Sequence, residues 1–242
     1  MLFRSGDIKL TQFSPYNGNY YSYYFDGTDD YLSIADSTNL QLGTGDFTVE
    51  GWFKPLTSKT SSVSCFYIKG INTTGGIIFG VSTDYIFMRH TGATDITYTA
   101  GSGVLKDWNH IAWVRSGNTV TIYRNGVSVA SGSVSLNQND TSSVYIGSYT
   151  GLASADNRYG GYVSNFRIVK GTALYTSTFT PSTTPLTAVA NTQLLTNQSN
   201  KFVDNSNNAF TITKSGEVAV STVNPFGLNS GQSYYFDGTG DW

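Results

Sequence analysis

Residues 47–55 read Phe47-Thr48-Val49-Glu50-Gly51-Trp52-Phe53-Lys54-Pro55. The chemical type of the side chain alternates with a period of two until the pattern ends at Lys54-Pro55. This period of two is typical of a β-strand, in which successive side chains point to opposite faces of a sheet. Because proline has no amide hydrogen to give to a neighbouring strand, Pro55 marks the place where the strand leaves its sheet. The stretch therefore predicts a strand that is covered on at least one face.

Further strand patterns follow on both sides of this one, and clusters of Gly, Asp and Ser separate them. They comprise residues 76–81, 85–88, 96–99, 108–115, 119–124, 127–129, 143–147 and 161–168. Asn125-Gly126 supplies the pair of positive φ angles that a tight type I′ hairpin needs. No window of ten or more residues shows a helical stripe, so the sequence predicts an all-β fold, an antiparallel two-sheet jelly-roll sandwich.

The composition excludes several classes of protein. Of 242 residues, 26 are glycine and 5 are proline, aromatic residues reach 14%, and charged residues are only 12%. This mixture does not suit a coiled coil, a charge-rich disordered chain or a helical bundle. A net charge of −2 argues against nucleic-acid binding, which needs clustered Lys and Arg. The single cysteine, Cys65, excludes a disulfide framework, and no apolar stretch is long enough to predict a membrane span.

Five blocks in a fixed order resemble the laminin-G-like modules of the concanavalin A-like superfamily. They are Tyr24-Phe25-Asp26-Gly27 with Asp30-Tyr31-Leu32, Gly45 to Pro55, Trp108 to Arg115 with Ile122 to Gly126, Tyr145-Ile146-Gly147, and Gly161 to Ile168. The resemblance implies a concanavalin A-like jelly roll over roughly residues 20–170. The segments 171–175 and 194–206 are similar to linkers in repeat proteins of marine bacteriophages and bacteria, which implies a tail-fibre-like virion protein or an adhesin.

The two ends of the chain match each other. Residues 5–16 align with 215–226, and residues 22–31 align with 233–242, with substitutions that keep the chemical class. A period this long indicates tandem domains rather than a solenoid. We expect a linker strand at 1–19, a jelly roll at 20–180, connecting strands at 181–225 that complete this domain or open the next, and a truncated start of the next repeat at 226–242. The chain could be a fragment of an array, a natural end that pairs with a neighbour, or a tail that folds back.

Catalysis is not expected. Glycoside hydrolysis generally needs two carboxylates that flank the bond, and the chain has only two glutamates, Glu50 and Glu217. Glu217 falls in the repeated segment, and the strand signature of laminarinase-like relatives is missing. His110 lies inside a strand pattern and fits a packed residue better than a base.

Calcium is a possible ligand, and no other cofactor is expected. Asp26, Asp29 and Asp30 fall within one turn, Asp46 lies in a Gly-rich loop, and Ca²⁺ prefers clustered carboxylate oxygens from loops. The resemblance also implies a single structural or bridging calcium. The alternative is that these aspartates only cap the backbone of a tight turn.

Two sets of residues could bind a glycan by stacking and hydrogen bonding. The first follows a predicted strand and comprises Tyr85, Phe87, Arg89 and His90, with Tyr98 on the next strand. The second lies in a predicted loop and comprises Tyr149, Asn157, Arg158 and Tyr159, with Asp156 beside them. Either set could instead be ordinary strand packing, since Tyr and Phe favour strands. Trp52, Trp108 and Trp113 fit the core better than a binding surface, because all three lie in strongly patterned strands.

The sequence therefore favours a non-catalytic attachment or decoration module on a virion surface, binding a host-surface glycan or protein. A bacterial cell surface or extracellular location, as a calcium-dependent adhesin repeat, is an alternative. Another is a structural subunit that assembles with neighbouring virion or array subunits, as a homo-oligomer, by strand exchange without binding a ligand. Weak single contacts would gain strength from several copies.

Overall fold

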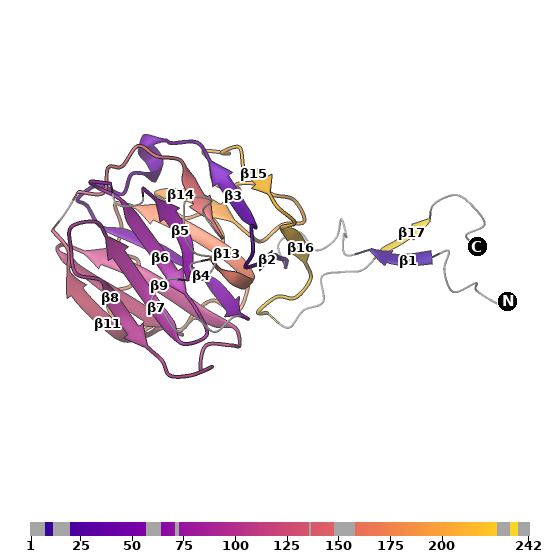
Figure 1. Cartoon of the computed structure of the whole chain (residues 1–242), viewed down its shortest axis with the longest axis horizontal. Helices are drawn as coiled ribbons and strands as arrows, with labels where there is room; N and C mark the ends of the chain where they lie inside the picture. Colours follow the sequence, from indigo (N-terminus) through magenta and orange to yellow (C-terminus); the bar gives the residue numbers. More distant parts are fainter. Residues whose placement is uncertain are drawn as a thin grey trace.

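Two antiparallel sheets packed face to face form the body of the chain in a computed structural model (Figure 1). The structure describes residues 20–56, 64–70, 73–135, 137–147 and 158–226, and the backbone alone of 8–11 and 233–236. The eight-stranded sheet has the order β11 (Val127–Ser133), β10 (Thr119–Arg124), β9 (Asn109–Ser116), β4 (Phe47–Pro55), β13 (Gly160–Lys170), β2 (Ser22–Asp26) and β16 (Ala219–Ser221), with β14 (Thr192–Thr196) also paired to β13.

The second sheet has seven strands. Their order is β15 (Thr213–Ser215), β3 (Tyr31–Ile34), β12 (Val144–Ile146), β5 (Cys65–Lys69), β6 (Ile77–Val81), β7 (Tyr85–His90) and β8 (Ile96–Thr99). One 3₁₀ turn, η1 (Thr38–Leu40), lies between β3 and β4. The prediction of an all-β, antiparallel two-sheet jelly roll is confirmed.

The central strand β4 shows why this sequence builds two layers. Its neighbours on the two sides are β9 and β13, so its backbone is paired along both edges. Phe47, Val49 and Phe53 point into the space between the sheets and are fully buried. Trp113 of β9 lies opposite Val49, is also fully buried, and donates its indole N–H to the Phe87 carbonyl at 3.0 Å. Burial of these large apolar side chains stabilises the sandwich.

The hairpin between β10 and β11 has the geometry that its sequence predicts. Asn125 has φ 49° and Gly126 has φ 80°, the pair of positive angles of a type I′ turn. A Cβ atom on Gly126 would lie 1.7 Å from the Phe179 carbonyl oxygen. Glycine is therefore required here both for the backbone angle and for the close approach of the chain that crosses the hairpin.

That crossing chain, residues 172–187, runs over the outer face of the eight-stranded sheet. Its Ala173, Tyr175 and Phe179 pack on an outer apolar cluster of Ala112, Val114 and Tyr123. The rings of Tyr175 and Phe179 stack at 3.6 Å with an interplanar angle of 7°. We call residues 172–187 the strap, because they cover part of a face that would otherwise be exposed.

Residues 192–221 contribute three strands to the sandwich: β14 pairs with β13, β15 with β3, and β16 with β2. A separate two-stranded sheet joins β1 (Ile8–Thr11) to β17 (Ser233–Phe236) and lies apart from the sandwich (Figure 1). The expected division into segments 1–19, 20–180, 181–225 and 226–242 stays a prediction. Within the described residues, no helix has the length and apolar character needed to cross a membrane.

Candidate functional site

A hollow of 430 Å³ opens on the outer face of the eight-stranded sheet. Two tryptophans and a phenylalanine supply its aromatic surface, and an amide and two hydroxyl side chains supply its polar groups. Its lining residues are Trp52, Trp108, Asn125, Pro181, Ser182, Thr183, Pro225 and Phe226. A few polar groups in a mostly apolar concavity are typical of a small-molecule site.

The alternation of β4 places Trp52 in this hollow. Since Val49 and Phe53 point inward, Glu50 and Trp52 point to the opposite face, away from the core. Trp52 lies opposite His110 of β9, with ring centroids 5.3 Å apart in an edge-to-face contact. Its ring also meets Phe226 at 6.0 Å. Trp52 is half-buried, so the expectation that it belongs to the core is wrong.

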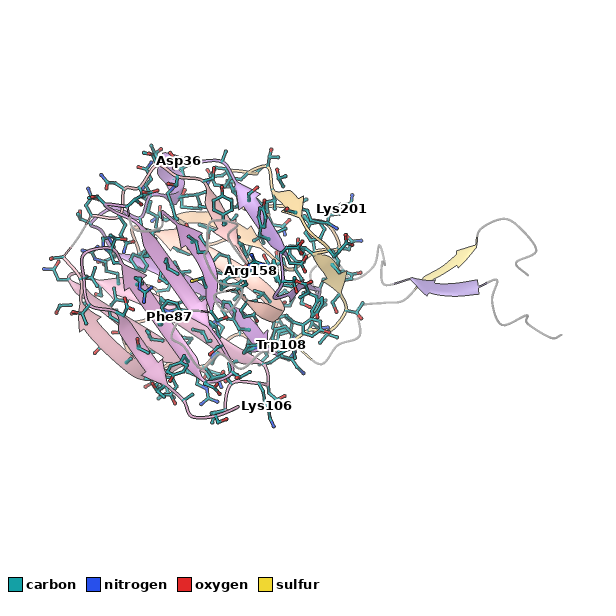
Figure 2. The ribbon with its side chains drawn as sticks, viewed as in Figure 1. Asp36, Phe87, Lys106, Trp108, Arg158 and Lys201 are labelled. Carbon is teal, nitrogen blue, oxygen red and sulfur yellow. The ribbon has the colours of Figure 1, made fainter. Side chains whose placement is uncertain are left out.

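Trp108 lies just before β9 and is likewise half-buried rather than in the core (Figure 2). Its ring centroid is 6.5 Å from that of Tyr162, and Tyr162 in turn lies 5.0 Å from Tyr24. A line of half-buried aromatic rings thus runs from the hollow across β13 to β2. Only Trp113, of the three tryptophans expected in the core, is there.

The strap and the segment after β16 form the walls. The amide N–H of Phe179 in the strap donates to the Gly126 carbonyl at 3.0 Å, which ties the strap to the hairpin beside the hollow. Pro181, Ser182 and Thr183 follow directly and line one side, while Pro225 lines another. Proline fixes the backbone φ, so two walls contain residues whose backbones are already restricted.

Beneath the strap, Glu50 anchors a buried ionic network. Its carboxylate is fully buried and accepts hydrogen bonds from Arg167 Nε and Nη2 at 3.0 and 2.5 Å, from Tyr175 Oη at 2.9 Å, and contacts His110 Nε2 at 3.0 Å. These partners come from β13, the strap and β9. The network therefore joins three strands to the strap.

The surroundings of Glu50 argue against a role as a catalytic acid. Burial by itself would raise the pKa of Glu50, but the hydrogen bond from His110 and the charge of Arg167 outweigh it and hold the pKa below its usual value. A general acid of a glycosidase needs a raised pKa and contact with substrate. Glu50 instead has a lowered pKa and is fully buried beneath the strap, and Glu217 is exposed in the turn between β15 and β16.

The first predicted glycan set is divided between the two faces of the seven-stranded sheet. Tyr85 and Arg89 are half-buried on the outer face, where the Arg89 guanidinium pairs with Asp95 at 2.6 Å. Phe87 lies on the same strand, β7 (Figure 2), but it is 1% exposed and packs with Cys65, Ile68 and Ile78. His90 is buried and Tyr98 packs against the inner core. The structure therefore does not bring these five residues to one surface.

The second predicted set is also not a single surface. Tyr149 and Asn157 lie outside the described residues. Tyr159 is fully buried between the sheets, and its hydroxyl donates to the Tyr162 carbonyl at 2.8 Å, so this residue belongs to the core and not to a ligand surface. Arg158 is half-buried beside β5, where its backbone forms an isolated parallel β-bridge with that of Cys65.

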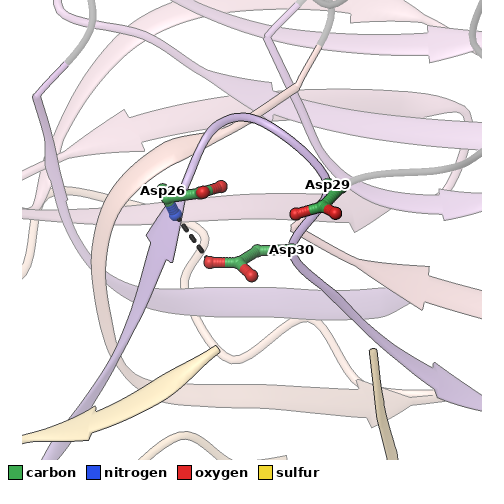
Figure 3. A group of neighbouring side chains, drawn as sticks. All are labelled: Asp26, Asp29 and Asp30. Atoms are coloured by element: carbon green, nitrogen blue, oxygen red, sulfur yellow. Dashed lines mark hydrogen bonds between the residues drawn. The ribbon is translucent and has the colours of Figure 1, made fainter. Parts of the chain in front are cut away.

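The predicted calcium residues Asp26, Asp29 and Asp30 come together in the turn between β2 and β3 (Figure 3). One carboxylate oxygen from each lies within 4.8 Å of the others, a spacing that oxygens around one Ca²⁺ at 2.3–2.6 Å can have. Asp30 Oδ2 accepts from the Asp26 amide at 2.8 Å, and Asp26 Oδ1 accepts from the Thr28 amide at 2.6 Å. The turn therefore caps itself but keeps carboxylate oxygens free.

The carboxylate of Asp30 is buried more deeply than a turn that only caps itself requires. It is 1% exposed, and its Oδ1 has no hydrogen bond of normal geometry among the described residues, although the backbone amide of Glu217 lies close enough to lower the Asp30 pKa in part. Burial, with the charges of Asp26 and Asp29, raises the pKa of Asp30 above its ordinary value. A Cβ on Gly216 would lie 2.6 Å from this same oxygen. Three clustered carboxylates, one of them buried with a raised pKa, therefore fit a cation that would neutralise their charge.

Asp46, the fourth predicted ligand, is not part of this group. Its Oδ1 accepts a hydrogen bond at 2.8 Å from the amide of Gly117, in the turn between β9 and β10. Asp46 therefore serves as a cap for a loop of the eight-stranded sheet.

A family model described as the concanavalin A-like lectin/glucanases superfamily matches residues 26–177. The chain belongs to this superfamily. The match confirms the predicted resemblance at the level of the superfamily, whose description covers both lectins and hydrolases. The sequence matches none of the curated proteins.

Two solved structures agree on the fold, and a third is similar over part of its length. A candidate carbohydrate-binding protein from Bacteroides ovatus ATCC 8483 is 16% identical with a TM-score of 0.59, over 87% of this chain and 61% of its own. The heptameric SAP-like pentraxin of Limulus polyphemus is 13% identical with a TM-score of 0.50, over 84% and 98%. Domains LG4-5 of the mouse laminin α1 chain are 16% identical with a TM-score of 0.48, over 67% and 47%. The chain thus spans about half of the laminin structure and 61% of the Bacteroides protein.

Proposed function

We propose that this chain is a non-catalytic glycan-binding module and that the glycan occupies the hollow between Trp52 and Trp108. The observation that carries the proposal is the 430 Å³ space that these two half-buried indoles share with Asn125, Ser182 and Thr183. A pyranose ring has a face of C–H groups that packs on a flat aromatic ring, and its hydroxyls need hydrogen-bond partners at the rim. The hollow offers both.

The absence of a catalytic role is part of the proposal. Glu50 is committed to Arg167, His110 and Tyr175 in a fully buried position, and so it cannot reach a glycosidic bond in this arrangement. The fold shared with the Bacteroides protein is compatible with carbohydrate binding. We further propose an extracellular setting, on a phage virion or a bacterial surface, where several modules would act together.

An array of immobilised polysaccharides and host-surface glycans tests the function. We expect the purified chain to be retained on at least one class of glycan and to release no reducing sugar from it. Retention on no glycan would contradict binding, and turnover of a β-glucan would contradict the absence of catalysis. Runs with Ca²⁺ and with EDTA show whether the cation matters for the ligand.

We also propose that the turn of Asp26, Asp29 and Asp30 binds Ca²⁺ and stabilises the sandwich. At about 10 mM Ca²⁺ and a dissociation constant of about 10⁻³ M, as in extracellular modules, the free energy of unfolding should rise by about 1.4 kcal/mol. This corresponds to a rise in Tm of about 3–6 °C relative to EDTA, measured by differential scanning calorimetry.

Two variants make the calcium test specific. Asp30→Asn should remove the Ca²⁺-dependent rise, and because the raised pKa of Asp30 means that its charge is unfavourable in the folded protein, this variant should be no less stable than the wild type in EDTA at pH 7. Asp46→Asn should keep the rise, since Asp46 lies outside the turn and its Oδ1 acceptor is retained. If the Tm of the wild type is the same with Ca²⁺ and with EDTA, the aspartates only cap the turn.

A further inference from the structure

The small sheet outside the sandwich has an unusual pairing. β1 and β17 run antiparallel, with Lys9 opposite Tyr235, Leu10 opposite Tyr234 and Thr11 opposite Ser233. These strands lie more than two hundred residues apart in the sequence. Nothing in the two-sheet body pairs with either of them among the described residues.

The same pairing already exists once inside the sandwich. At its edge, Ala219 lies opposite Tyr24, Val220 opposite Tyr23 and Ser221 opposite Ser22. The step from β1 to β16 is 219 − 9 = 210 residues, and the step from β2 to β17 is 235 − 24 = 211 residues. These are the two offsets at which the sequence repeats, and so the β1–β17 ladder reproduces all three pairs of the β16–β2 ladder in the same register.

The surroundings of the two ladders differ. β2 pairs with β13 along its second edge, and its Tyr23 and Phe25 are fully buried in the core. β17 carries the same Ser-Tyr-Tyr-Phe sequence but has β1 as its single strand partner in a two-stranded sheet. A ladder of two four-residue strands is marginal by itself, and an unpaired strand edge is a template for another chain.

We propose that the β1–β17 ladder joins copies of this chain, with β17 of one copy paired to β1 of a second copy in the register of β2–β16. The two strands are complementary halves that lie in different parts of the same chain, so the contact is heterologous. It closes into a dimer when two copies exchange strands reciprocally, and it otherwise extends into a chain of copies.

Joining copies in this way places several of the proposed binding hollows in one assembly. Each additional hollow then acts at the effective concentration set by its neighbour, which strengthens attachment without any new contact to the ligand. The joining itself does not depend on what the hollow binds, so it can be tested apart from the proposed function.

Disulfide capture between separate chains tests the proposal. One batch carries Lys9→Cys and the other Tyr235→Cys, because these positions face each other in the ladder. The native Cys65 is fully buried, and burial raises its pKa to about 12, so its thiol should not compete. On mixing and mild oxidation, we expect covalent dimers of twice the 26.2 kDa chain, measured by non-reducing electrophoresis and mass spectrometry.

A control pair of cysteines in a shifted register distinguishes disulfides that form within the ladder from disulfides that form by random collision of two chains. Lys9→Cys mixed with Ser233→Cys places the thiols two positions apart along the ladder, beyond the Cα separation that a disulfide accepts. We expect at least about tenfold less mixed dimer from this pair. Equal yields from both mixtures would overturn the proposal. So would a double variant, Lys9→Cys with Tyr235→Cys, that closes only within single chains while the mixed single variants stay unlinked.

Discussion

Replacing Glu50 by glutamine is expected to lower the free energy of unfolding by about 3–5 kcal/mol, the cost of leaving one partner of a buried ion pair alone. Arg167 is 5% exposed and would lose the carboxylate that meets its Nε and Nη2. Tyr175 would lose a charged acceptor for its hydroxyl, and this loss would weaken the attachment of the strap to the sheet. Urea unfolding followed by tryptophan fluorescence measures the change.

Asp95→Asn is the matched control for this prediction. It removes the carboxylate of the Arg89–Asp95 pair, whose side chains are 35% and 28% exposed, and exposed pairs contribute about 1 kcal/mol or less. We expect a small change in this control and a large one in Glu50→Gln. A loss below about 1 kcal/mol for Glu50→Gln would show that the network does not anchor the strap.

The pH dependence of the same variant gives an independent check. The pKa of Glu50 is lower in the folded protein than in the unfolded chain, so its contribution is present above the ordinary glutamate pKa and is lost as the pH falls through the folded value. Wild-type stability should therefore decline in acid below about pH 4.3. In Glu50→Gln this part of the decline should be absent, and the two unfolding curves should converge at low pH.

Trp108→Ala is expected to weaken glycan retention by about thirtyfold, since truncation of an aromatic hot spot commonly costs about 2 kcal/mol. Trp108 is half-buried at the hollow, and its ring centroid lies 6.5 Å from that of Tyr162, so removal of the indole should affect ligand binding more than folding. Trp52→Ala should have a similar effect on binding, with a greater loss of stability because Trp52 packs on His110 and Phe226. Affinity electrophoresis in the glycan found on the array measures both.

Tyr85→Ala provides the control for these two variants. Tyr85 is a half-buried aromatic residue on the seven-stranded sheet, in the set that the sequence suggested for glycan binding. Retention should not change in Tyr85→Ala if the hollow holds the ligand. The opposite result, with Tyr85→Ala defective and Trp108→Ala normal, would move the site to the other sheet.

Local patterns were enough to predict the sandwich. The alternation around Phe47 and Phe53, the Asn125-Gly126 hairpin and the strand patterns on both sides of it specify antiparallel strands with one buried face, and the structure contains them. The clustering of Asp26, Asp29 and Asp30 was also predictable, because all three lie within one short turn.

The hollow was harder to predict, although one signal was present. The alternation that sends Val49 and Phe53 inward also sends Trp52 outward, so Trp52 could have been placed on the outer face with Glu50. The remaining walls come from residues 181–183 and 225–226, which lie far from Trp52 in the sequence. Nothing in their local pattern indicates that they cross the eight-stranded sheet beside the Asn125 hairpin.

The sequence alone determined the strands, their turns and the repeat at its two ends, because these depend on residues within a few positions of one another or on direct comparison of segments. Tertiary structure decided which aromatic residues are exposed, that Glu50 is held by Arg167 and Tyr175, and that β1 meets β17 in the register of β16 and β2. Those outcomes depend on contacts between residues up to two hundred positions apart, and the burial and pairing that fix them exist only once both sheets have packed.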